Sequence, residues 1–141
     1  MKRAWAVGLV LGSLAAGCGP DEGDTADAVV PAPTFDVIYN DVLEDRGCTE
    51  SVCHGKSVSW TPLSDIDTAH QNLLGDASLP GCGLTQLVVP GDPESSLLYM
   101  RVSPDLDPEA ACGAKMPQGS SGVQATKAQM IYDWILAGAQ R

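Results

Sequence analysis

Two cysteines and a histidine stand close together in the segment Cys48-Thr-Glu-Ser-Val-Cys53-His54-Gly55. Thiols form thioethers, disulfides or metal bonds, and an imidazole nitrogen is a common metal ligand. Haem of the c type is attached where two cysteine sulfurs add to its vinyl groups and the histidine that follows reaches the iron. The segment therefore predicts a covalent haem on Cys48 and Cys53, with His54 as an axial ligand. Four residues separate the cysteines here, more than in the usual C-x-x-C-H motif, so we expect the extra backbone to bulge outward.

A six-coordinate iron needs a second axial ligand, and the sequence offers a methionine for it. Met116 lies between Lys115 and Pro117 in a Gly-rich stretch ahead of the last predicted helix. A thioether sulfur in a Pro-flanked loop suits the open face of the iron and raises the reduction potential. His70 is the alternative distal ligand, although its place on the apolar side of a predicted helix is also typical of a half-buried packing residue.

The same cysteines allow other chemistry. A Cys48–Cys53 disulfide together with a Cys82–Cys112 disulfide would use four thiols and need no cofactor. If haem is bound, Cys82 and Cys112 still pair with each other. A zinc site from Cys48, Cys53, His54 and either His70 or Cys82 is a third alternative, although adjacent Cys and His ligands are awkward around one tetrahedral ion.

The first residues have the pattern of a secretory signal. Met1-Lys2-Arg3 is basic, residues 4–14 are mostly apolar, and small residues precede Cys18. The ending Leu14-Ala-Ala-Gly-Cys18 resembles a bacterial lipobox, which implies cleavage before Cys18 and lipid attachment to its sulfur. We expect a signal peptide at residues 1–17 and an acidic, Pro-punctuated tether at 18–33. An export signal also places the remaining cysteines in an oxidising compartment.

The charge of the chain limits its partners. The formal charge is −10, and removal of residues 1–17 would bring it to −12. Nucleic acid and anionic membrane surfaces would repel such a protein. We expect membrane attachment only through a lipid on Cys18, and a basic redox partner if the acidic surface docks a protein.

Hydrophobic periodicity predicts an all-α domain at residues 34–141 with long loops rich in Gly and Pro. Helices are expected at 35–46 after Thr34, at 65–74 after Ser64, from Asp92-Pro93 to 104, and at 126–137. The run 87–89 is strand-like but is ended by Pro90-Gly91.

Residues 35–139 resemble the small cytochrome c-like domains of bacterial exported proteins. The resemblance lies in four segments in this order: Cys-His-Gly at 53–55, Val-Pro-Gly-Asp-Pro-Glu-Ser-Ser-Leu at 89–97, Met-Pro at 116–117, and Trp-Ile-Leu-Ala-Gly-Ala at 134–139. It implies one haem c, proximal ligation by His54, distal ligation by Met116, and one-electron transfer as the function. We therefore expect an electron-transfer protein rather than an enzyme, anchored in the cell envelope and facing the periplasm or the cell surface from the outer membrane. The alternative is a haem-free, disulfide-stabilised surface lipoprotein with a binding or structural role.

Overall fold

The computed structural model describes residues 30–55, 61–77, 79 and 81–141 of the chain. The chain divides into two units, Met1–Val30 and Pro31–Arg141, and every helix of the described residues lies in the second. The predicted signal peptide, Cys18 and the tether up to residue 29 lie outside the described residues. Within the described ranges, no helix is both long enough and apolar enough to cross a membrane.

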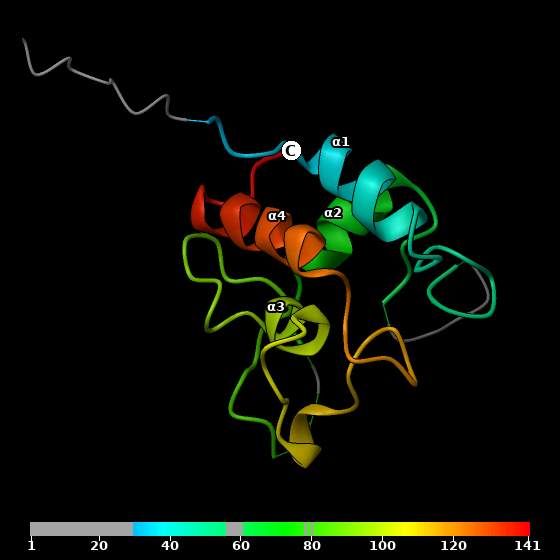
Figure 1. Ribbon diagram of the computed structural model, residues 1–141, viewed down its shortest axis with the longest axis vertical. Coiled ribbons are helices and arrows are strands. Elements are labelled where there is room, and N and C mark those ends of the chain that lie inside the picture. Colours follow the sequence, from blue (N-terminus) through cyan, green and yellow to red (C-terminus); the bar gives the residue numbers. More distant parts are fainter. Residues whose placement is uncertain (1–29, 56–60, 78, 80) are drawn as a thin grey trace, which may run out of the picture. The chain divides into compact units, whose positions relative to one another are not determined.

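The described part of the second unit is helical. Its elements are α1 (Phe35–Ile38), the π-helix η1 (Tyr39–Glu44), α2 (Ile66–Leu73), α3 (Leu97–Val102), the 3₁₀ turn η2 (Ala110–Cys112) and α4 (Ala125–Leu136), as Figure 1 shows. Extended pairing among these residues is limited to two isolated bridges, Asp76 with Gln86 and Val89 with Asp92. The prediction of an all-α class is confirmed at this level.

The first predicted helix changes its winding partway along. It starts as the α-helix α1 and widens at Tyr39 into the π-helix η1, whose wider turn continues to the bond from Cys48 N to Leu43 O at 2.8 Å. Single π turns are frequent at functional sites. This bond therefore connects the end of the helical segment to Cys48, the first cysteine of the candidate haem motif.

Two helix starts differ from the prediction. Asp65, not Ser64, is the N-cap of α2, because its carboxylate accepts the Thr68 N–H at 2.9 Å. The third helix begins at Leu97 rather than at Asp92. Asp92 instead accepts the Ser95 N–H at 3.1 Å, and so its side chain closes a turn in place of a first helical turn.

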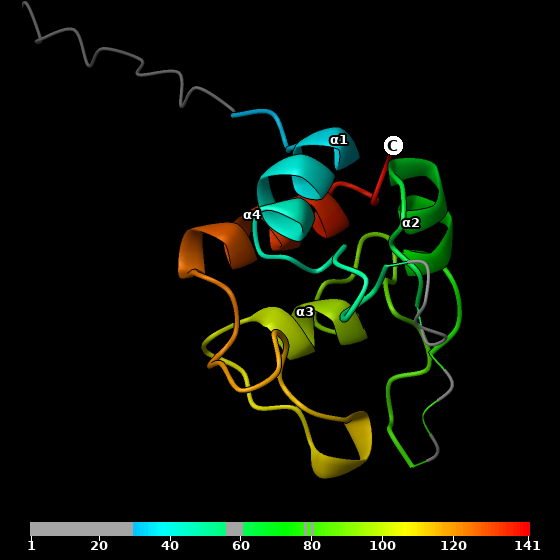
Figure 2. The same ribbon diagram turned by 90° about the vertical axis from the view of Figure 1, so that its right-hand side faces the viewer.

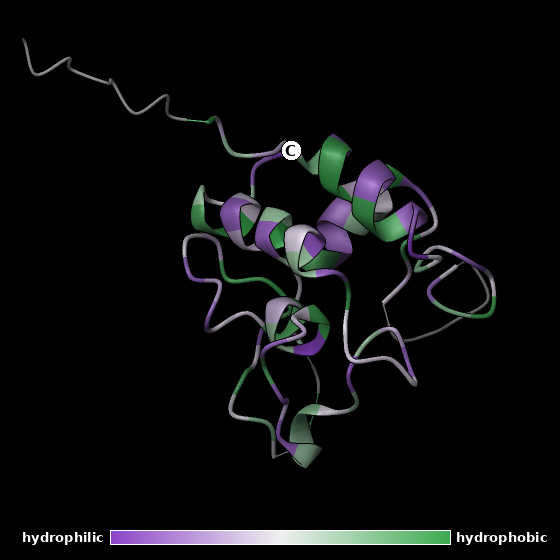
Figure 3. Cartoon of the chain, in the orientation of Figure 1, coloured by the Kyte–Doolittle hydropathy of each residue, from purple (hydrophilic) through white to green (hydrophobic). Residues whose placement is uncertain are grey.

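The hydrophobic core lies between α1, η1, α2 and α4. The ring of Phe35 lies 4.8 Å from that of His70 and 5.1 Å from that of Trp134, which joins the three helices α1, α2 and α4. Figures 1 and 2 show α1 beside α4, and α3 on the other side of α4. Polar and apolar residues alternate along the helices in Figure 3, as expected where one side of each helix is buried.

Candidate functional site

The two cysteines and the histidine lie in one closed loop, residues 47–55, called the cysteine loop below. His54 donates its backbone N–H to the Cys48 carbonyl at 2.9 Å, so the chain returns to Cys48 directly after the second cysteine. Inside the loop, Glu50 O accepts N–H bonds from Cys53 and Gly55, both at 2.9 Å. The extra residues between the cysteines thus form a hydrogen-bonded bulge, as the spacing predicts.

Gly55 is required where the cysteine loop closes. It is buried, and a Cβ added there would lie 2.8 Å from Ser51 Cα and 2.9 Å from both Ser51 N and Thr49 O. All three atoms belong to the backbone, so no side chain can turn aside to make room. The glycine of the Cys-His-Gly motif therefore allows the backbone at Gly55 to approach the backbone at Thr49 and Ser51 closely.

Both cysteines of the loop are free thiols, with Cys53 exposed and Cys48 half-buried. The second disulfide of the haem-free alternative, Cys48–Cys53, is thus not formed in the structure. Burial raises the pKa of the Cys48 thiol, and the neighbouring Cys53 raises it further, while Arg46 and a backbone hydrogen bond act in the opposite direction. Cys48 is therefore a protonated thiol at neutral pH, and Cys53 is the more accessible sulfur.

The imidazole of His54 is oriented by a backbone carbonyl. Its Nδ1 lies 3.1 Å from the Thr61 carbonyl oxygen, which can only accept a hydrogen bond. Nδ1 must then carry the proton, and in the neutral ring Nε2 keeps its lone pair. Leu63 N donates to His54 O at 2.6 Å, which ties the same two chain segments together a second time. This arrangement is the one in which histidines bind metals, with the second ring nitrogen donating to an outer acceptor.

A shallow pocket of about 280 Å³ lies beside the cysteine loop and is lined by Thr49, Ser51, Gly55 and Ser64. Three of these residues belong to the cysteine loop, and Ser64 directly precedes the N-cap of α2. The pocket places solvent-accessible space next to the segment that carries both thiols and the imidazole.

Met116 lies on a different loop, which is fastened to the C-terminal end of α3. The side chain is half-buried against the hydrophobic core, and the Met116 N–H donates to Arg101 O at 2.8 Å. Lys115 Nζ donates to Ser103 O at 2.6 Å. Met116 is therefore held in a fixed position relative to α3, a feature that the sequence could not show.

His70 has a structural environment. Its Nε2 lies 2.9 Å from the Ala139 carbonyl oxygen, and its ring packs on Phe35 and Trp134. The packing role predicted for it is confirmed. The contacts with Phe35 and Trp134 place the His70 ring in the core, and its Nε2 has a carbonyl partner there.

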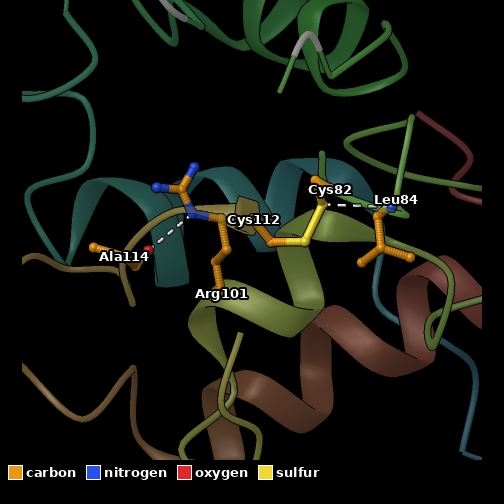
Figure 4. The surroundings of a disulfide bond; sticks show 5 residues. All are labelled: Cys82, Leu84, Arg101, Cys112 and Ala114. Atoms are coloured by element: carbon orange, nitrogen blue, oxygen red, sulfur yellow. Dashed lines mark hydrogen bonds between the residues drawn. A yellow bond between two sulfur atoms is a disulfide. The ribbon is translucent and has the colours of Figure 1, made fainter. Parts of the chain in front are cut away.

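The predicted bridge between Cys82 and Cys112 is present, with an S–S distance of 2.07 Å (Figure 4). It fastens the loop after α2 to η2, just ahead of the Met116 loop. Because the Cys82 sulfur is bonded to Cys112, it is not available to the zinc set that included it. No group of three or more His, Cys, Asp or Glu side chains arranged to hold a metal ion occurs among the described residues.

Comparison with known proteins gives no relative. No protein-family model, no curated protein and no solved structure matches this chain. The likeness to cytochrome c-like domains thus stays a prediction from the motifs.

Proposed function

We propose that the second unit is a single-haem c-type cytochrome domain that transfers one electron at a time. The observation that carries this proposal is the state of His54, whose Nδ1–H donates to Thr61 O and whose Nε2 is left with a lone pair. Two free thiols, at Cys48 and Cys53, precede this imidazole in the same closed loop. An imidazole oriented in this way, in one loop with two free thiols, suits an iron ligand, and a local disulfide makes no use of it.

The residues fit the group in their donor chemistry. Cys48 and Cys53 are free to form two thioether bonds, His54 Nε2 would be the proximal ligand, and the Met116 sulfur the distal ligand. A haem bound in this way supplies an iron that cycles between two oxidation states. The Thr61 carbonyl fixes the imidazole and its tautomer, and a thioether ligand from Met116 would favour the reduced state.

The test is expression of the mature chain in a host that carries haem-attachment machinery. We expect an intact mass increased by one haem and sharp visible bands in the reduced protein. Cys48→Ser with Cys53→Ser should remove the attached mass, and Cys82→Ser with Cys112→Ser is the matched control that should keep it. His54→Ala should abolish low-spin ligation, while Met116→Ala should keep the haem with an altered spectrum and a lower potential. A colourless wild-type protein with two disulfides by mass overturns the proposal.

The site of action proposed here is the cell envelope. The basic start, the apolar stretch and the lipobox-like ending support export and lipidation of Cys18, with the outer membrane as destination. The excess of acidic side chains supports a basic redox partner and association rates that fall with salt. Cys18→Ala should release the protein from membrane fractions, and retention of that variant in membranes contradicts the anchor.

A second candidate is a haem-free lipoprotein domain with a binding or structural role. The observation that favours it is a core closed by side chains alone, with Phe35, His70 and Trp134 in ring contact and Cys82 bonded to Cys112. This candidate predicts a colourless protein that melts cooperatively, and in which His54→Ala costs no more than the packing and the hydrogen bond of that side chain.

A further inference from the structure

We infer that Arg101 is a positioning residue for Met116, holding the loop 113–116 so that the methionine sulfur is presented in one place. The inference rests on the proposed function, because the proposed haem supplies the iron that the Met116 sulfur would bind. It concerns a residue that carries no signal in the sequence, since it lies 13 positions before Ala114, whose carbonyl oxygen accepts its Nε–H.

Arg101 forms hydrogen bonds to the loop through both its main chain and its side chain. Its carbonyl oxygen accepts the Met116 N–H at 2.8 Å, and its Nε donates to the Ala114 carbonyl at 2.9 Å. Figure 4 shows the guanidinium turned away from the disulfide toward Ala114. Two bonds from one residue to loop positions two apart fix the direction of the backbone that carries Met116.

The guanidinium also fits against Gly113. A Cβ on Gly113 would lie 3.0 Å from Nη2 and 3.3 Å from Cζ of Arg101, and Gly113 has φ +83°. The loop thus passes directly under the guanidinium, at a position where a side chain would be strained and crowded. The Cys112 disulfide fixes the residue just before Gly113, so the loop is held at both ends of this contact.

The position of the Arg101 side chain is not explained by an ion pair with an acidic group among the described residues. Of the described cations, Arg141 forms the ion pairs, with Asp36 and Asp67, while Arg101 is half-buried and donates to a carbonyl. A charged donor makes a stronger hydrogen bond to a carbonyl than a neutral one. The Nε–H of Arg101 therefore bonds a carbonyl of the Met116 loop rather than a carboxylate.

This positioning matters because a thioether is a weak, neutral ligand. If haem is bound, the Met116 sulfur would compete for the iron with any small ligand that can enter when the loop moves away. Loss of a charge-assisted hydrogen bond should shift this competition by roughly tenfold to a hundredfold.

The test uses imidazole as the competing ligand on the oxidised, haem-loaded protein. Arg101→Gln should raise the apparent affinity for imidazole at least about tenfold, and Arg101→Lys should give an intermediate value because it keeps the charge without the planar donor. Arg141→Gln removes the same unit charge from exposed ion pairs and is the matched control that should stay at the wild-type value. Ile135→Val lowers stability in the core and separates loss of stability from loss of positioning.

A second readout needs no haem. In the unloaded protein, the Met116 amide should exchange with solvent about tenfold faster in Arg101→Gln and at the wild-type rate in Arg141→Gln. If the wild-type protein binds haem but Arg101→Gln matches Arg141→Gln in both measurements, the inference fails and the proposed function stands. If the wild-type protein binds no haem, the proposed function fails, and the exchange rate of the Met116 amide alone decides whether Arg101 holds the loop.

Discussion

Replacement of Gly55 by alanine is the sharpest test of the cysteine loop. The added methyl group would lie 2.8 Å from Ser51 Cα and 2.9 Å from Ser51 N and Thr49 O. Carbon atoms in ordinary contact stay about 3.5–4.0 Å apart, so the methyl group cannot be accommodated without movement. All three contacts are backbone atoms, and the hydrogen bonds from Cys53, His54 and Gly55 that close the loop must then lengthen or break.

The size of the effect follows from the packing. Overpacking at a well-filled position costs typically about 1–3 kcal/mol. In a unit of the size of Pro31–Arg141, that corresponds to a fall in melting temperature of roughly 4–15 °C. Under the proposed function, the same variant should also attach less haem, because the closed loop is what brings the two thiols together.

Gly83→Ala is the matched control. A Cβ at Gly83 meets no atom within 4 Å, and this glycine is exposed with a backbone that alanine can adopt. It should melt at the wild-type temperature or slightly above, since alanine restricts the unfolded chain. The measurement is thermal unfolding followed by circular dichroism, with haem content by absorbance. Equal melting temperatures for Gly55→Ala and Gly83→Ala would refute the close approach on which this reasoning rests.

Three further outcomes are expected. Replacing both Cys82 and Cys112 by Ser opens a link across 30 positions and should lower the free energy of unfolding by about 3–4 kcal/mol in urea titrations. In the haem-free protein, iodoacetamide should modify Cys53 before Cys48, because burial raises the pKa of the Cys48 thiol; peptide mapping after partial alkylation decides this, and the reverse order contradicts the burial. Hydrogen bonds from Thr68 hold the pKa of Asp65 below its ordinary value, so its contribution to stability is present above the carboxyl pKa of the unfolded chain and is lost as pH falls below it. Thermal melts from pH 7 to pH 3 should therefore fall less steeply for Asp65→Asn than for the wild type.

The sequence predicts the helices well where apolar residues repeat along one face. The segments around α2 and α4 are examples, because Ala69, Leu73, Ile131 and Ile135 recur at helical spacing and are buried. The helix predicted from Asp92 fails for a local reason. Asp-Pro is typical of a helix start, but the Asp92 side chain bonds Ser95 N and the Asp92 carbonyl accepts from Ser96 Oγ, which stabilises a turn instead.

For the candidate site, residue types and spacing could indicate the donors but not what holds them. The partner of His54 Nδ1 is a main-chain carbonyl, at Thr61, and any residue type could supply it. The same applies to Arg101, whose bonds to the Met116 loop depend on how α3 ends and how the chain returns. The Cys82–Cys112 bridge could be predicted because pairing of the remaining thiols left no other partner, and the structure confirms it.

One helix positions both halves of the candidate site. α4 packs against α1, which continues through η1 into the cysteine loop, and also against α3, whose C-terminal end holds the Met116 loop. Its 12 residues contain Trp134 and Ile135, which are among the most deeply buried side chains of the described core, and none of the candidate ligands. Ligands on loops can be precise only when the loops are tied to rigid elements that share a core. The domain thus separates the two tasks: α4 fixes the frame, while hydrogen bonds to the Thr61 carbonyl and with Arg101 orient His54 and the loop that carries Met116.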